Sequence, residues 1–152
     1  MTERAAHAKA LFEDGLNCAQ AVFAAFSDLT GIDYETSLRL SSSFGGGMGR
    51  MREVCGALSG IFLAAGALWG DYDPRDNGAK KEHYARIQAL AAAFREENGD
   101  ILCRNILGLK TAGPDDPTPA ARTREYYASR SCGDCVASAV EILERAIAEA
   151  AE

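Results

Sequence analysis

Hydrophobic residues recur at intervals of three or four along most of the chain, the spacing that places them on one face of a helix. This pattern predicts helices over residues 2–14, 17–29, 33–42, 53–69, 79–97 and 100–108, followed by one helix or a helix pair over 119–151. No segment shows the alternation or the richness in β-branched residues that a strand requires. We therefore expect an all-α fold, an orthogonal or up-and-down bundle of five to seven helices.

The same periodicity predicts which side chains face the core. The expected inward residues are Ala6, Ala10 and Leu11 in the first segment, and Cys18, Val22, Phe26 and Leu29 in the second. Projected at roughly 100° per residue, the last segment places Cys132 at the centre of its apolar arc and Cys135 at the edge. Residues 110–120 are rich in proline and polar side chains, so we expect a loop there.

Residues 54–70 form the longest uncharged run of the chain. A membrane span needs roughly 20 apolar residues, and this run is shorter, contains four glycines and is bracketed by Glu53 and Asp71. It therefore predicts a buried central helix and no membrane span. Within it, Gly56 and Gly60 lie one turn apart, and Ala64 and Ala67 continue a stripe of small residues along which another helix can approach closely.

Length and charge narrow the class of protein. The chain has 152 residues, of which 47% are hydrophobic, enough for one domain, 1–152, with a core that needs no disulfides. The net charge is −6 and the basic residues are scattered, so neither nucleic acid nor an anionic membrane is an expected partner. The first 15 residues carry charges throughout and resemble no secretory leader, which predicts a cytoplasmic protein without stable disulfides.

The cysteines share a position relative to the predicted helices. Four of them fall in the first turn of a helix on its inward face: Cys18 after Asn17, Cys55 after a glycine run, Cys103 after Asp100, and Cys132 after Ser131. A helix start presents free N–H groups and a partial positive charge, which lower a thiol pKa and favour a thiolate or an anionic cluster. Arg50 and Arg52 add positive charge near Cys55, unless both are solvated surface residues.

Glycines are concentrated around Cys55, in the stretch SSSFGGGMGRMREVCGALSG of residues 41–60. Gly45, Gly46 and Gly47 can adopt positive φ angles and supply bare N–H groups to a sulfur or a bound anion, and Gly56 follows Cys55 directly. These four glycines are therefore candidate cofactor-binding residues. The structural alternative is a flexible loop followed by tight helix packing, which explains the small stripe without a cofactor.

Several stretches carry a resemblance to a known family. The motifs GLNCAQAV, GGGMGRMREVCGALSG, ILCRNILG and CGDCVASAVEIL resemble, over nearly the whole chain, the C_GCAxxG_C_C family. Its CGAxxG motif stands here as Cys55, Gly56, Ala57 and Gly60. The resemblance implies a small bacterial or archaeal helical protein with redox or electron-transfer work, but no settled reaction or substrate. The family pattern asks for one cysteine in the last helix, and Cys132 matches it, so Cys135 is an addition.

Three functions compete on this pattern. In the first, Cys18, Cys55, Cys103 and Cys132 supply four thiolates to an iron–sulfur cluster that exchanges electrons with a protein partner. Zinc suits the same ligands less well, because structural zinc sites usually draw on close pairs in short loops.

The other two functions need no metal. In one, Cys132 and Cys135 of the CGDC sequence, or Cys55 and Cys18, cycle between dithiol and disulfide. In the other, the chain is a non-catalytic adaptor or homodimeric helical module whose cysteines fill the core. The sequence favours the iron–sulfur hypothesis slightly over the dithiol one.

Overall fold

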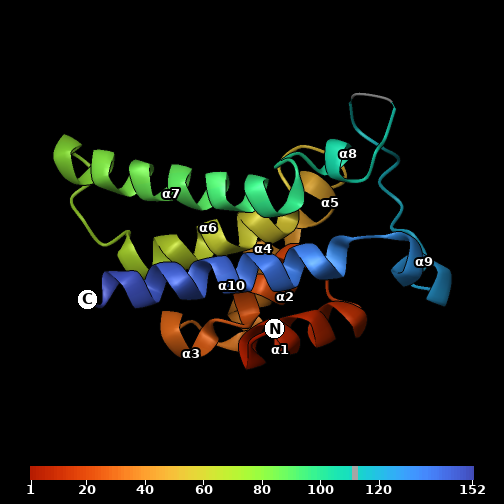
Figure 1. The fold of residues 1–152 in the computed structure, drawn as a ribbon, viewed down its shortest axis with the longest axis horizontal. Helices are drawn as coiled ribbons and strands as arrows, with labels where there is room; N and C mark the ends of the chain where they lie inside the picture. The colour runs from red at the N-terminus through yellow and green to blue at the C-terminus, as the bar shows by residue number, and fades with distance from the viewer. Residues whose placement is uncertain (111–112) are drawn as a thin grey trace.

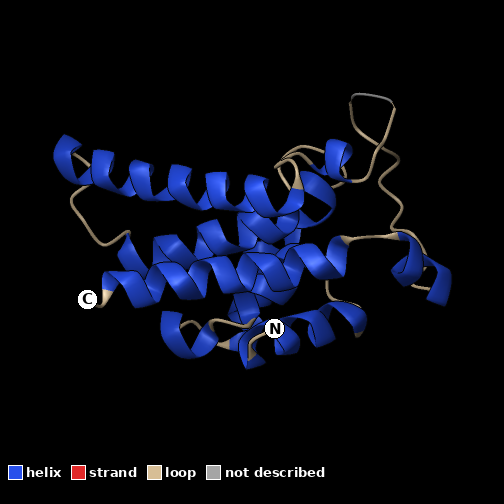
Figure 2. Ribbon diagram, in the orientation of Figure 1, coloured by secondary structure: helices blue, strands red, loops and turns tan. Residues whose placement is uncertain are grey.

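The computed structural model describes residues 1–110 and 113–152, and its regular structure is helical throughout these two ranges (Figure 2). Six helices have seven or more residues: α1 (Glu3–Glu13), α2 (Cys18–Ala24), α4 (Tyr34–Ser41), α6 (Gly56–Trp69), α7 (Asn77–Asn98) and α10 (Cys132–Ala150). The shorter ones are α3 (Ser27–Thr30), η1 (Ser42–Phe44), α5 (Gly45–Met48), α8 (Cys103–Ile106) and α9 (Arg124–Ser129). The all-α prediction is confirmed, but these short helices raise the number above the expected five to seven.

Two helices organise the core. Helix α10 contacts α1, α2, α6 and α7, and α2 lies against α6. Figure 1 shows α7 on one side of α6 and α10, and α1 with α3 on the other, while α9 stands at the end of the molecule where α10 begins. Within the described residues, no helix combines the length and the apolar character needed to cross a membrane, and the central helix α6 has only 14 residues.

Most helix boundaries agree with the hydrophobic pattern, but two predicted faces were wrong. Helix α1 buries Ala5, Ala8 and Phe12, while Ala6 and Ala10 are exposed and only Leu11 of the predicted residues packs, half-buried, against the core. Its apolar arc is rotated so that the large Phe12 ring packs edge-on against Tyr127 of α9, with the ring centroids 5.8 Å apart.

Leu29 is 44% exposed, because the predicted second helix is in fact two. Helix α2 ends at Ala24 and α3 begins at Ser27, and this break takes Leu29 out of phase with Val22 and Phe26. In the central helix, Ala64 is buried as expected but Ala67 is exposed. Thr111 and Ala112 of the predicted loop 110–120 lie outside the described residues.

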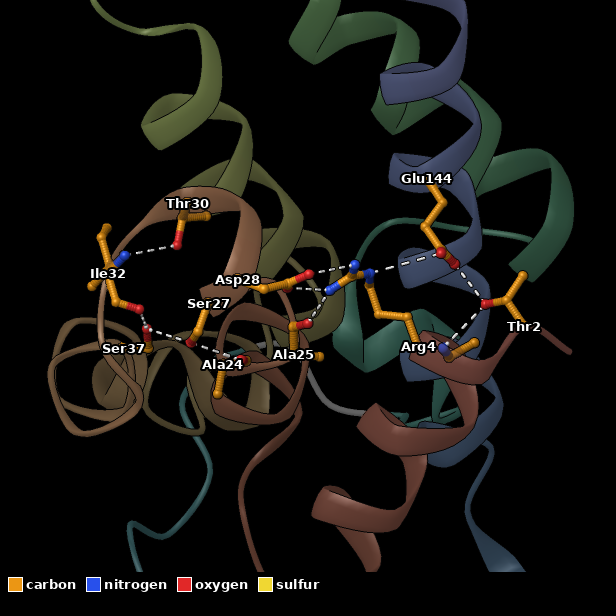
Figure 3. Close-up of polar contacts among 11 residues, drawn as sticks. Thr2, Arg4, Ala24, Ala25, Ser27, Asp28, Thr30, Ile32, Ser37 and Glu144 are labelled. Carbon is orange, nitrogen blue, oxygen red and sulfur yellow. Dashed lines mark hydrogen bonds and ion pairs between the residues drawn. The ribbon is translucent and has the colours of Figure 1, made fainter.

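One arginine connects three helices at the end of the bundle opposite α9. Arg4 of α1 donates through Nη2 to Asp28 of α3 at 2.9 Å and lies 3.7 Å from Glu144 of α10, while its Nη1 also donates to the carbonyl of Ala25 (Figure 3). The guanidinium group lowers the pKa of the Asp28 carboxyl through this hydrogen bond. The contacts hold α1 and α3 against α10, and so fix the frame on which the cysteines are placed.

Candidate cysteine site

All five cysteines line a single cavity of about 60 Å³ at the end of the bundle near α9. They come from four separate parts of the chain: Cys18 from α2, Cys55 from the start of α6, Cys103 from α8, and Cys132 and Cys135 from α10. Phe12, Ile106, Leu107 and Tyr126 complete the apolar part of the wall. The cavity thus collects thiols that are far apart in the sequence.

The predicted positions at helix starts are confirmed. Cys18, Cys103 and Cys132 are the first residues of α2, α8 and α10, and Cys55 is the N-cap of α6. The Asn17 side chain caps α2 together with Gln20 in a capping box, which fixes the turn that carries Cys18. The sulfurs therefore lie among main-chain N–H groups that no helical carbonyl accepts from.

Several of these N–H groups donate to sulfur. The Gly46 and Ala19 amides donate to Cys18, and the Ala57 and Leu58 amides donate to Cys55, and each of these hydrogen bonds lowers the pKa of its thiol. Gly46 is a residue of the glycine-rich loop, as the sequence suggested. The loop therefore brings backbone donors to the cavity.

The glycine-rich loop has an unusual backbone. Gly46 and Gly47 have φ angles of 70° and 71°, as predicted, while Gly45 has an ordinary φ of −65°. Arg50 and Arg52 also lie in the left-handed region, which costs a non-glycine residue about 1–3 kcal/mol. The surrounding hydrogen bonds must offset this strain.

A short antiparallel contact holds the loop against the segment before α8. Val54 and Leu102 form an isolated bridge, and the Cys103 amide donates to the Glu53 carbonyl at 2.6 Å. The Cys55 amide donates to the Ile101 carbonyl at 2.8 Å. These bonds place Cys55 and Cys103 beside each other although 48 positions separate them in the sequence (103 − 55).

The glycines of the motif stand where a side chain would collide with a cysteine. A Cβ atom on Gly47 would lie 2.6 Å from the Cβ of Cys103, and one on Gly56 would collide with the Cys18 sulfur. A Cβ on Gly45 would collide with the Asn17 side chain, which carries the cap of α2. Close approach to Cys103 and Cys18 therefore explains Gly47 and Gly56, close approach to Asn17 explains Gly45, and the role of these glycines in holding a cofactor remains a prediction.

The predicted lowering of the thiol pKa is wrong. Burial, followed by the charge of Cys55, raises the pKa of Cys18 to about 12, and burial with the charges of Cys18 and Cys55 raises that of Cys132 to about 12. Burial also raises the pKa of Cys103, although Arg52 opposes it. N–H groups lower the pKa of Cys18 and Cys55, and arginines lower those of Cys103 and Cys132, but desolvation and neighbouring thiols outweigh these effects.

Four of the thiols form a mutually interacting set. The charges of Cys55 and Cys103 raise the pKa of Cys18, and the charge of Cys55 raises that of Cys103. The pKa of Cys132 is raised by the charges of all three other thiols, so every pair among these four interacts. Cys135 interacts with Cys55 and has the largest single effect on its pKa. A hydrogen bond with the Cys135 thiol, together with burial, raises the pKa of Cys55 well above its ordinary value.

The position of Cys135 differs from the sequence prediction. It is 2% exposed and belongs to the hydrophobic core, whereas Cys132, expected at the centre of the apolar arc, is half-buried. The helical projection assumed that the apolar face of the last helix is covered by the core along its whole length. The first turn of α10 instead faces the cavity, and only the second turn enters the packed core.

Arg52 is the site residue that the sequence left undecided. It is only 4% exposed, and its Nη1 lies 3.5 Å from the Cys103 sulfur. Its Nη2 donates to Asp115 at 3.1 Å. A permanent positive charge therefore faces the thiol cavity, where it favours any negative charge on sulfur.

The raised pKa values predict that the reduced, metal-free protein loses stability as the pH rises above 9. The unfolded thiols release protons near their ordinary pKa of 9.0, while folded Cys18 and Cys132 keep theirs to about 12. Each thiol should therefore cost about 1.4 kcal/mol of unfolding free energy per pH unit within that window. Urea unfolding at several pH values under reducing conditions measures this slope.

Cys132→Ser provides the control for that slope, because serine does not titrate in this range. The unfolding free energy of the variant should fall less steeply with pH than that of the wild-type chain, and the slopes should differ by about 1.4 kcal/mol per pH unit, the contribution of one proton. Equal slopes in the two proteins would show that Cys132 has an ordinary pKa and that the thiols do not interact as described.

As the side chains stand, no group of three or more histidine, cysteine, aspartate or glutamate residues within ranges 1–110 and 113–152 is arranged to hold a metal ion. All five thiols are free in the structure. Five soft thiols nevertheless converge on one cavity beside N–H donors and an arginine, and thiolates are ligands that soft metal ions prefer.

Comparison with known proteins gives one match. The family described as "Putative redox-active protein (C_GCAxxG_C_C)" matches residues 16–146, a span that includes all five cysteines and the glycine-rich loop. No curated protein and no solved structure matches the chain. Because the match covers most of the sequence, the chain belongs to the C_GCAxxG_C_C family.

Proposed function

We propose that the protein transfers electrons through an iron–sulfur cluster held by Cys18, Cys55, Cys103 and Cys132. The observation that carries the proposal is the convergence of these four thiols, which come from four separate helix starts, on one cavity. Core-filling cysteines have no reason to meet in this way. Membership of a family described as redox-active also supports an electron-transfer function.

The electrostatics of the cavity favour a bound cation. Four thiols gathered in a buried space resist ionisation, and metal ions supply the positive charge that makes their thiolate forms favourable. The Gly46 amide and the Arg52 guanidinium group already lower the pKa of Cys18 and Cys103, respectively. These donors would stabilise negative charge on the ligating sulfurs and raise the reduction potential of the cluster.

A cluster suits these ligands better than a single zinc ion, because structural zinc sites usually draw on close pairs in short loops, whereas these four thiols come from four separate helix starts. Bonds of about 2.3 Å to one tetrahedral zinc bring the sulfurs within about 3.8 Å of one another. A cluster, which contains several metal and sulfide atoms, separates its cysteine ligands more widely.

When bound, the cluster would supply one-electron exchange with a redox partner. The protein contributes four ligands on four helix starts, and an apolar wall of Phe12, Ile106 and Leu107 that limits water at the site. We further propose that the protein works in the cytoplasm, whose reducing conditions keep unligated thiols reduced.

Anaerobic reconstitution with iron and sulfide tests the proposal. We expect a coloured protein with visible absorption, and iron and acid-labile sulfide in comparable amounts. Metal analysis of protein purified without oxygen distinguishes iron from zinc. A colourless protein that holds no iron after reconstitution would overturn the proposal.

A metal-free dithiol function is the second candidate, and the contact between Cys55 and Cys135 favours it. This pair differs from the pairs expected from the sequence, Cys132 with Cys135 and Cys55 with Cys18. Oxidation would form one S–S bond and release two protons and two electrons to a partner. The high pKa of Cys55 opposes rapid attack, since the thiolate is the nucleophile.

Thiol counting across a range of controlled redox potentials separates the two candidates. Reversible loss of two thiols in protein that cannot be loaded with iron would favour the dithiol function. No loss of thiols in any physiological range would exclude it. If neither iron nor a disulfide is found, the adaptor hypothesis is left.

A further inference from the structure

A second cavity, of about 250 Å³, opens beside the cysteine cavity and shares part of its wall. The shared residues are Asn17, Gly46, Arg52, Arg122, Tyr126 and Arg130. On its outer side the second cavity is lined by the glycine-rich loop and by Pro117, Pro119 and Ala120. We call it the arginine groove, after Arg50, Arg52, Arg122 and Arg130 in its wall.

The charge of this groove is opposite to that of the chain. The protein has a net charge of −6, yet four arginines line the groove and its described wall contains no acidic side chain. Asp115 offsets part of this charge from outside the wall, 3.3 Å from Arg50 and 3.1 Å from Arg52. Positive charge concentrated in a concave site on an acidic protein favours an anionic ligand.

Arg122 and Arg130 keep their charge uncompensated. Arg122 donates to the carbonyls of Phe12 at 3.0 Å and Leu16 at 3.1 Å, which hold the guanidinium group in place without neutralising it. Arg130 lies over the Tyr126 ring, 5.1 Å from its centroid. Within the described residues, neither arginine forms an ion pair with a carboxylate.

We propose that the arginine groove binds a small organic oxyanion, a molecule with a carboxylate or phosphate group, next to the thiols. Guanidinium groups match the planar or forked geometry of these anions and remain charged at any physiological pH. The prolines and Ala120 provide an apolar side for the body of the ligand. The shared wall brings such a ligand against the Cys132 end of the cysteine cavity.

Arg130 marks the boundary between the two cavities. Its charge lowers the pKa of both Cys103 and Cys132, so it acts on the thiols as well as on the groove. The anion proposal does not rest on the iron–sulfur proposal, because Arg50 and the prolines line the groove but not the cysteine cavity. If the arginines served only to balance a cluster, the metal-free protein would show no anion site.

Binding can be measured on the reduced, metal-free protein by titration with sodium phosphate and separately with sodium acetate, at constant ionic strength with chloride as the reference. We expect saturable shifts of the amide resonances of Gly46 and Gly49, which line the groove. The phosphate and acetate arms distinguish the two headgroups. Shifts that never saturate, or equal shifts with chloride, would overturn the proposal.

Two variants sharpen the test. Arg130→Gln should weaken anion binding about tenfold, and Arg130→Lys, which keeps the charge, should retain most of it. Arg75→Gln removes the same charge from a fully solvated position outside the groove and should leave binding unchanged. Equal weakening by Arg130→Gln and Arg75→Gln would show that only the net charge matters. A wild-type-like amide spectrum verifies that each variant is folded.

Discussion

Serine in place of Cys18, Cys55, Cys103 or Cys132 is expected to lower the iron bound after anaerobic reconstitution to about one tenth of the wild-type amount or less. Serine has nearly the same shape as cysteine, but its hydroxyl group remains protonated and cannot replace a soft thiolate ligand. Because the four thiols come from four helix starts, no neighbouring cysteine on the same helix can replace Cys18, Cys55 or Cys103. Iron analysis and visible absorption measure the loss.

Cys135→Ser is the matched control for this series. Cys135 is not among the four proposed ligands and lies in the packed core, so its replacement should leave the iron content and the absorption spectrum near wild type. Denaturant unfolding of each metal-free variant separates lost ligation from lost folding. Iron loss in Cys135→Ser equal to that in the other variants would contradict the assignment of four ligands, and full retention in Cys132→Ser would assign the fourth ligand to Cys135.

Local signals explain how much of the site the sequence could predict. The Asn17 side chain, the glycine run before Cys55 and the position of Cys132 are short-range features, and each one precedes or marks a helix start that the structure contains. Apolar periodicity then directed the thiols inward. Helix-start signals and apolar periodicity both depend on residues a few positions apart, so they can be recognised in a single sequence.

The properties that depend on distant neighbours could not be predicted. The thiol pKa values follow from burial and from the meeting of four chain segments, so the lowering expected from helix starts had the wrong sign. Arg52 lies in a sequence that reads as a solvated basic stretch, and only its contacts with Cys103 and Asp115 reveal its burial. The break after α2 contains neither proline nor glycine, and so gave no signal.

The arginine groove illustrates the same limit at larger scale. It combines the glycine-rich loop with residues of segment 117–130, which lies more than 60 positions further along the chain. In the sequence, only Arg50 and Arg52 lie near the glycines that are expected to face a bound anion, and Arg122 and Arg130 give no such signal. Their convergence is a result of the fold.

Alanine at Gly60 and alanine at Gly66 are expected to change the stability of α6 in opposite directions. A Cβ atom on Gly60 would lie 2.8 Å from the Cβ of Val22 and 3.0 Å from the Ala19 carbonyl oxygen, both on the packed helix α2. Overpacking of this kind costs about 1–3 kcal/mol, and the upper part applies because a backbone carbonyl cannot move aside. The better helix propensity of alanine returns about 1 kcal/mol, so the net loss should be about 2 kcal/mol.

Gly66 lies on the same helix, but a Cβ atom there would meet nothing within 4 Å. Gly66→Ala should therefore keep the whole propensity gain and stabilise the protein by about 1 kcal/mol. The two variants carry the same chemical change, so their difference of about 3 kcal/mol isolates the approach of α2 to α6, the contact that carries Cys18 toward Cys55. Urea unfolding of the reduced, metal-free proteins measures both values. If Gly60→Ala proved as stable as Gly66→Ala, α2 and α6 would not pack at the distance on which the cysteine cavity depends.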